Sequence, residues 1–142
     1  VSRFVGQING RRQFDDSLGV CRFDSQDLLL ELHTFNSVTG LSYEPLDALR
    51  KGRQIVHLMR AFNVRHGLTA ELEEPSERYK SNPSDGGAAD SHPEAAWPIM
   101  KRNYYKTMGW DPDSGMPLPE TLRGLDLPEL IADFTPVGAT PR

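Results

Sequence analysis

Cysteine is almost absent from this chain of 142 residues, in which Cys21 is the only one. A single cysteine excludes an internal disulfide framework and is typical of a reducing compartment, so we expect a cytoplasmic protein. No apolar run approaches the roughly 20 residues that span a bilayer, and no signal-peptide pattern opens the chain. Acids and bases are interspersed, with a net charge of −4, which argues against a nucleic-acid surface. We therefore expect no membrane and no nucleic-acid partner.

The chain also lacks any alternating pattern that predicts a β-strand, any internal repeat and any glycine-rich phosphate loop. Its 12 glycines and 11 prolines fall mainly between segments of helical period. The sequence therefore predicts an all-α fold, an irregular multi-helix domain with long loops over residues 1–142. Because Val1 is not an initiator methionine and the first dozen residues form no recognisable start of a fold, we expect a fragment of a larger multidomain protein.

Five segments are predicted to be helical from apolar residues at helical spacing and from capping and terminating residues. Ser25 and Ser42 are the expected caps of the first two. Pro45 falls in the first turn of the second, where its missing N–H costs little. Gly52, inside that helix, indicates a kink or a close helix crossing. The expected ranges are 26–37, 43–66, 98–108, 119–125 and 128–131.

The second helix has the clearest amphipathic stripe, the pattern of a helix that packs on a core. This stripe consists of Ile55, Leu58, Met59 and Phe62. Arg53, Arg60 and Arg65 lie largely off it, and we interpret them as solvated surface charge. His33 lies near the apolar face of the first helix, and we interpret it as a packed core histidine.

Residues 69–92 are predicted to form a long loop from their composition. The segment is first acidic, with Glu73 and Glu74, and then rich in proline, glycine and serine between Asn82 and Gly87. No hydrophobic period survives in it. Because almost no apolar residue there can contribute to a core, we expect this loop to be mobile in the isolated chain and to pack against neighbouring domains or a partner subunit in the parent.

The stretch from Asp15 to Phe23 combines two kinds of ligand. Asp16 precedes Cys21 by five residues, with Gly19 between them. A carboxylate only accepts hydrogen bonds, and its two oxygens suit a flat donor edge such as an aminopyrimidine. A thiolate binds iron–sulfur clusters or copper, and glycine lets a bulky ligand approach. The segment can therefore hold a heterocycle and a metal centre side by side, although a lone cysteine is more often a buried, inert apolar residue.

Four motifs support a more specific identification. They read Asp-Ser-Leu-Gly-Val-Cys at 16–21, Gly-Arg-Gln-Ile at 52–55 with Leu58, Arg60, Phe62, Asn63 and Gly67 after it, Tyr-Tyr-Lys-Thr-Met-Gly-Trp-Asp at 104–111, and Gly-Met-Pro-Leu-Pro-Glu-Thr-Leu at 115–122. In this order, over roughly residues 12–127, they resemble the C-terminal part of the aldehyde ferredoxin oxidoreductases. The chain departs from the family pattern at Val20, Gln54, His66 and Leu118, where leucine, glutamate, glutamate and threonine are usual.

The resemblance implies a tungsten or molybdenum enzyme in which two pterins hold the metal beside a [4Fe–4S] cluster. Cys21 would be the fourth cluster ligand, with the other three cysteines in the remaining domains of the parent chain. Asp16 would accept hydrogen bonds from a pterin, and the backbone at Leu18, Gly19 and Val20 would line it. The implied reaction oxidises a small-molecule aldehyde to a carboxylate. The implied electron acceptor is ferredoxin or an iron–sulfur electron-transfer subunit.

Two alternatives stay open at the level of sequence. The same scaffold and the same segment from Asp16 to Cys21 would occur in a relative such as the tungsten subunit of a benzoyl-CoA reductase. A non-catalytic helical interaction module, in which Cys21 is only a core residue, would also account for the helical pattern. Cysteines of a cluster motif elsewhere in the parent gene would exclude the second alternative.

Overall fold

The computed structural model describes residues 2–21, 23, 27–81, 85–86 and 94–134. Over these ranges the chain is helical and contains no strand, only an isolated antiparallel bridge between Trp110 and Pro117. The all-α prediction is confirmed. The elements are α1 (Ser2–Ile8), α2 (Arg11–Ser17), α3 (Leu28–Thr39), α4 (Pro45–Arg65), η1 (Ala70–Leu72), α5 (Glu77–Lys80), α6 (Trp97–Met108), α7 (Pro119–Gly124) and η2 (Pro128–Phe134). No helix in the described ranges is both long and apolar enough to cross a membrane.

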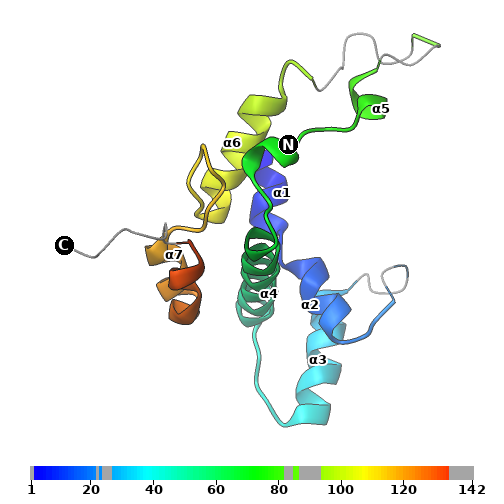
Figure 1. Ribbon diagram of the computed structural model, residues 1–142. Helices are drawn as coiled ribbons and strands as arrows, with labels where there is room; N and C mark the ends of the chain where they lie inside the picture. Colours follow the sequence, from blue (N-terminus) through cyan, green and yellow to red (C-terminus); the bar gives the residue numbers. More distant parts are fainter. Residues whose placement is uncertain (1, 22, 24–26, 82–84, 87–93, 135–142) are drawn as a thin grey trace.

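Helix α4 is the central element (Figure 1): α2, α3 and η2 pack against it, α1 packs against α6, and α7 packs against η2. Its 21 residues contribute to three separate small cores. Ala48 packs with α2 and α3, Val56 lies against the residues at the end of α6, and Ala61 packs with α7 and η2. The domain is therefore a set of small clusters joined by one long helix, not a single large core.

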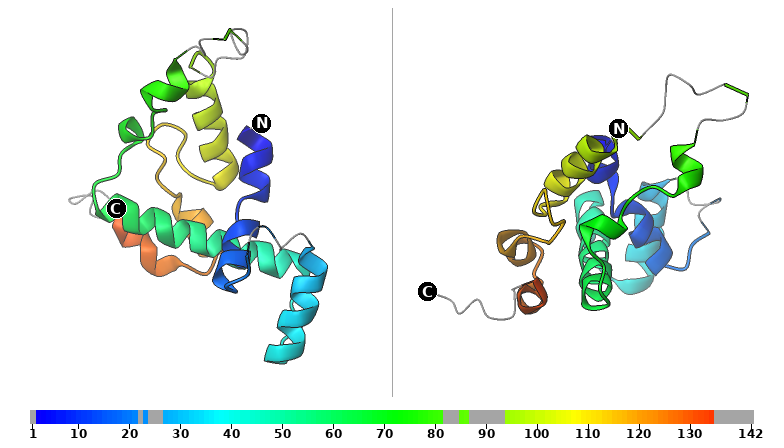
Figure 2. Two further views of the ribbon diagram at one scale, coloured as in Figure 1. Left: turned by 90° about the vertical axis from the view of Figure 1, so that its right-hand side faces the viewer. Right: turned by 45° about the horizontal axis from the view of Figure 1, so that its top comes forward.

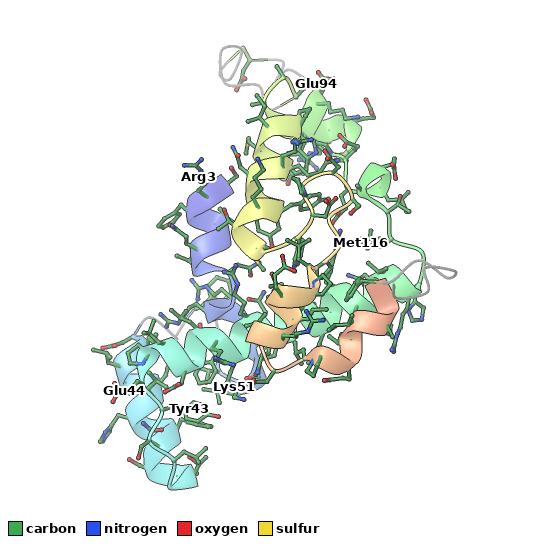
Figure 3. The ribbon with its side chains drawn as sticks, turned by 90° about the vertical axis from the view of Figure 1, so that its left-hand side faces the viewer. Arg3, Tyr43, Glu44, Lys51, Glu94 and Met116 are labelled. Atoms are coloured by element: carbon green, nitrogen blue, oxygen red, sulfur yellow. The ribbon has the colours of Figure 1, made fainter. Side chains whose placement is uncertain are left out.

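The first of these clusters joins α2 and α3 to the beginning of α4. Phe14, Leu32 and Ala48 are buried in it. The link between α3 and α4 is fixed by Asn36, whose amide donates to the carbonyl of Tyr43 at 2.9 Å and whose amide oxygen accepts from the Tyr43 N–H at 2.8 Å. Tyr43 and Glu44 lie together at this end of the molecule in Figure 3.

Gly52 marks a close helix crossing, as predicted. A Cβ atom built on Gly52 would lie 1.7 Å from the carbonyl oxygen of Gly10, where α2 begins. Gly10 itself has a φ of 117°, in the region that favours glycine. The crossing of α2 over α4 thus requires two glycines face to face, and this contact positions the beginning of α2 on α4.

Several helix boundaries differ from the prediction. Residues 2–17, which the sequence left without a recognisable start, form α1 and α2. Asp27 caps α3 by accepting from the Leu29 N–H at 2.9 Å, whereas the expected cap Ser25 lies outside the described residues. Glu44, not Ser42, is the N-cap of α4, with its N–H donating to Asp47 at 2.9 Å. Caps one to three residues apart are chemically similar, so the sequence does not separate them.

The interpretation of the apolar stripe on α4 was wrong in part. Leu58, Met59 and Phe62 are 46%, 56% and 62% exposed. The buried face of α4 instead carries Ala48, Gly52, His57, Arg60 and Ala61. Small residues let the neighbouring helices approach closely, so the crossings follow those residues instead of the largest apolar side chains.

His33 was also misplaced by the sequence. It is exposed on α3, and His57 on α4 is the fully buried histidine. The predicted long loop differs as well, because η1 and α5 lie within residues 69–81. The stretch from Asn82 to Gly87, where we expect mobility, is described only at residues 85–86.

Candidate functional site

The segment from Asp16 to Cys21 follows directly from the way α2 ends. The Val20 N–H donates to the Asp15 carbonyl at 3.3 Å, and the Gly19 N–H donates to the Asp16 carbonyl at 3.1 Å. These two bonds, with a left-handed residue between them, form a Schellman motif. Gly19 has a φ of 71°. The glycine therefore serves the left-handed turn, which directs the chain out of the helix toward Cys21.

The same turn leaves its outer side open. A Cβ built on Gly19 would meet no described atom within 4 Å, so packing does not require glycine there. Asp16, Gly19 and Cys21 are exposed, and Val20 is half-buried. Leu18 differs, since its side chain packs against the cluster around Phe14. Of these five predicted site residues, Leu18 can contribute only its backbone to a bound group.

Two adjacent carboxylates at the end of α2 have opposite environments. Asp15 is fully buried and pairs with Arg11 at 3.1 Å, while Arg12 lies 3.8 Å away. Arg11 also reaches Glu31 on α3 at 3.2 Å. Arg11 therefore links α2 to α3 and shares its charge with the buried Asp15, whereas the carboxylate of Asp16 is exposed.

These residues fit the cofactors that the resemblance implies. A carboxylate and a thiol lie on one exposed turn whose glycine leaves room beside the backbone. Cys21 can supply one of the roughly four thiolates of an iron–sulfur cluster. Among the described residues, no three His, Cys, Asp or Glu side chains gather closely enough to hold a metal ion.

A second polar region lies further along α4, toward its C-terminal end, and we call it the Arg60 cluster: His57, Arg60, Glu73, Tyr105 and Trp110. Arg60 is 4% exposed. Its Nη1 donates to Glu73 Oε1 at 2.6 Å, and its guanidinium carbon lies 4.7 Å from the Trp110 ring centroid. The Tyr105 hydroxyl donates to the other Glu73 oxygen, Oε2. Burial and this acceptor raise the pKa of Tyr105 well above its usual range.

His57 completes the cluster through its two ring nitrogens. Nδ1 lies 2.8 Å from the Arg53 carbonyl, and the Trp110 indole N–H donates to Nε2 at 2.9 Å. This pattern assigns the neutral tautomer with hydrogen on Nδ1. Burial lowers the pKa of His57, and the nearby Arg53 charge lowers it further, against the opposing effect of its backbone hydrogen bond.

Gly115 connects the loop after α6 to the cluster; Figure 3 labels its neighbour Met116 in that loop. The Gly115 carbonyl accepts a hydrogen bond from Arg60 Nε at 3.0 Å. A Cβ built on Gly115 would lie 2.4 Å from Arg60 Nη2, and its φ is 69°. Asp111 shapes the loop by accepting from the Ser114 N–H and hydroxyl, both at 2.7 Å, and these bonds lower the pKa of Asp111.

The interpretation of Arg53 and Arg60 as solvated charge was wrong. Arg53 donates to the carbonyl of Gly6 at 2.8 Å and to that of Thr107, so it ties α1 and α6 to α4. Burial lowers the pKa of Arg53. Arg65 is exposed, as predicted. The sequence did hold one indication that Arg60 is not ordinary surface charge, since Arg60 is one of the motif residues.

Two positions where the sequence departs from the family pattern have structural contacts here. The Gln54 amide donates to the carbonyl of Leu125 at 2.7 Å, a bond that an ionised glutamate could not donate. His66 stacks on Phe62 with ring centroids 4.2 Å apart. The first of these contacts ties α4 to the residue that ends α7.

The comparisons with known proteins agree with the motifs. The model of the family described as "Aldehyde ferredoxin oxidoreductase, domains 2 & 3" matches residues 2–127. No curated protein and no solved structure matches the chain. Because the match covers most of the 142 residues and includes α2, the turn after it and the Arg60 cluster, the chain belongs to the aldehyde ferredoxin oxidoreductase family.

Proposed function

We propose that this chain is part of a cytoplasmic tungsten or molybdenum bis-pterin oxidoreductase that converts aldehydes to carboxylic acids. The observation that carries the proposal is the Schellman turn after α2, which exposes Asp16 and Cys21 on one rigid unit. With the cofactors bound, an aldehyde and water give a carboxylic acid, two protons and two electrons, which leave singly through a [4Fe–4S] cluster to ferredoxin or a partner iron–sulfur subunit.

The residues of the turn have separate tasks in this proposal. Cys21 supplies one thiolate to the cluster, and cysteines in other domains of the parent chain supply the rest. Asp16 accepts hydrogen bonds from the N–H edge of a pterin, and the backbone from Leu18 to Val20 lies against its ring. One turn then fixes the separation of pterin and cluster, because the two backbone bonds at its base allow little motion.

Cys21→Ala in the enzyme that contains this chain tests the cluster ligand. We expect loss of the [4Fe–4S] electron paramagnetic resonance signal and of acceptor-linked activity. Normal iron content with an unchanged spectrum would refute the assignment.

Asp16→Asn and Asp15→Asn form a matched pair for the pterin contact. The first removes a charge-assisted hydrogen bond, worth roughly 1.5–3 kcal/mol, and turns a donor toward pterin N–H groups. We expect lower tungsten or molybdenum occupancy with iron largely retained. The second breaks the Arg11 pair and should lower thermal stability without changing the ratio of metals in the folded protein. If both variants had the same ratio of tungsten or molybdenum to iron, Asp16 would not be a pterin contact.

A further inference from the structure

A groove between α1 and α6 belongs neither to the turn after α2 nor to the proposed reaction. The two helices lie side by side in Figures 1 and 2. They touch closely where a Cβ on Gly6 would lie 2.8 Å from Thr107 Cγ2. The groove lies toward the beginning of both helices, and the segment at Glu73 and Glu74 forms a third wall.

One face of α6 forms the floor of the groove. Its lining residues recur at the spacing of a single helical face. These residues are Trp97, Met100, Lys101, Tyr104 and Tyr105, with Ser2 and Val5 opposite on α1. The groove has a volume of about 530 Å³, within the range of about 300–1,000 Å³ that is usual for small-molecule sites. Three aromatic side chains in one groove favour a planar, apolar occupant.

The walls are fixed by hydrogen bonds. The Trp97 indole N–H donates to the Glu73 carbonyl at 3.2 Å. Lys101 donates to the Ala70 carbonyl at 2.9 Å and pairs with Glu74 at 2.5 Å. Because these bonds connect α6 to η1 and to the segment after it, the groove is formed before any ligand arrives.

Among the described residues, the charged side chains that line the groove are paired. Glu73 is neutralised by Arg60 at 2.6 Å, and Glu74 by Lys101. A charged ligand would lose its hydration without gaining a counter-charge. We propose that this groove binds a neutral, planar, mainly apolar small molecule; the inference does not rest on the proposed function and uses none of the residues from Asp16 to Cys21.

Titration of the chain with N-phenyl-1-naphthylamine, a neutral aromatic fluorophore, tests the proposal. We expect saturable binding at one site, with quenching of Trp97 emission by the bound probe. Its anionic analogue 8-anilino-1-naphthalenesulfonate should bind at least about tenfold more weakly, because its charge finds no free partner. Non-saturable binding, or equal affinity for the two probes, would overturn the proposal.

Adjacent residues provide matched variants. Met100→Glu places a carboxylate in the groove and should weaken binding by about tenfold or more. Ile99→Glu changes the neighbouring residue, which is 65% exposed and outside the lining, and should change the affinity by less than about twofold. Val5→Glu and Phe4→Glu repeat this comparison on α1, in case Met100→Glu fails to fold by circular dichroism. Equal weakening by lining and non-lining variants would overturn the assignment of the site.

Discussion

The turn after α2 and the Arg60 cluster use similar polar residues in opposite ways. In the cluster, Glu73 accepts from both Arg60 and Tyr105, and both ring nitrogens of His57 are hydrogen-bonded, one to the Arg53 carbonyl and one to Trp110. At the turn, the backbone is hydrogen-bonded internally, while the side chains of Asp16 and Cys21 are exposed.

The difference separates positions that build the domain from positions that can contact something else. Each side chain of the cluster joins two elements: Arg60 connects α4 to the loop after α6 and to Glu73, and Trp110 connects that loop to His57. Such contacts are needed for folding whether or not a cofactor binds. Substitutions in the cluster should therefore change stability, whereas those at the turn should mainly change cofactor content.

Arg60→Met should give the largest effect on stability. It leaves Glu73 without its 2.6 Å partner and the Gly115 carbonyl without a donor. Breaking a buried pair on one side costs about 3–5 kcal/mol, and because the Glu73 side chain is 28% exposed, we take the lower end of that range. We expect a loss of that size in urea unfolding of the chain, against less than about 1 kcal/mol for Arg65→Met on the exposed side of α4. Equal losses would mean that Arg60 is not part of the scaffold.

Replacing Gly115 and Gly19 with alanine, one at a time, separates the effect of packing on stability from the effect of backbone strain. Both glycines have φ near 70°, so alanine at either costs about 1–2 kcal/mol in a left-handed conformation. Only at Gly115 would the new Cβ collide, 2.7 Å from Tyr105 Cζ, and overpacking adds about 1–3 kcal/mol. Urea unfolding should show Gly115→Ala to be the less stable variant. A larger loss of unfolding free energy for Gly19→Ala would contradict the finding that a Cβ at Gly19 meets no described atom within 4 Å.

Local signals in the sequence predicted much of this fold. Gly40 and Gly109 end α3 and α6 in left-handed conformations, and Pro45 and Pro119 begin α4 and α7. These residues fix the backbone where they stand, so their effect does not depend on distant contacts. The turn at the candidate site could be recognised in the sequence for the same reason, because it is built from consecutive residues.

The Arg60 cluster could not be predicted in the same way. The partners of Arg60 lie 13 and 55 residues away, at Glu73 and Gly115. From the helical pattern alone, an arginine beside an apolar stripe has the signature of surface charge. Two residues decide the burial of Arg60: Gly115, which leaves room for the guanidinium, and Glu73, which neutralises it. Their positions are not known before the loop after α6 and the segment after η1 have been placed.

Acid should destabilise the Arg60 cluster through His57, by a smaller amount than the substitutions above. Burial lowers the pKa of His57 below 6.5 in the folded chain. Below pH 6.5 the unfolded chain therefore binds the proton more readily than the folded one, and the free energy of unfolding falls as the pH falls. The loss is at most about 1.4 kcal/mol per pH unit and ends once the pH is below the folded pKa. Above pH 6.5 the stabilisation is fully present.

Urea unfolding of the wild type and of His57→Gln between about pH 5 and 8 measures this slope, since glutamine does not titrate there. The difference between the two proteins should grow with pH up to about 6.5 and then stay level, because other titrating groups contribute equally to both. Protonation would also turn an N–H of His57 toward the Trp110 indole N–H, so the Trp110 emission should change over the same range. A difference that does not vary with pH would mean that His57 is not held neutral, and the hydrogen bond from Trp110 to His57 would then not distinguish the cluster from the turn after α2.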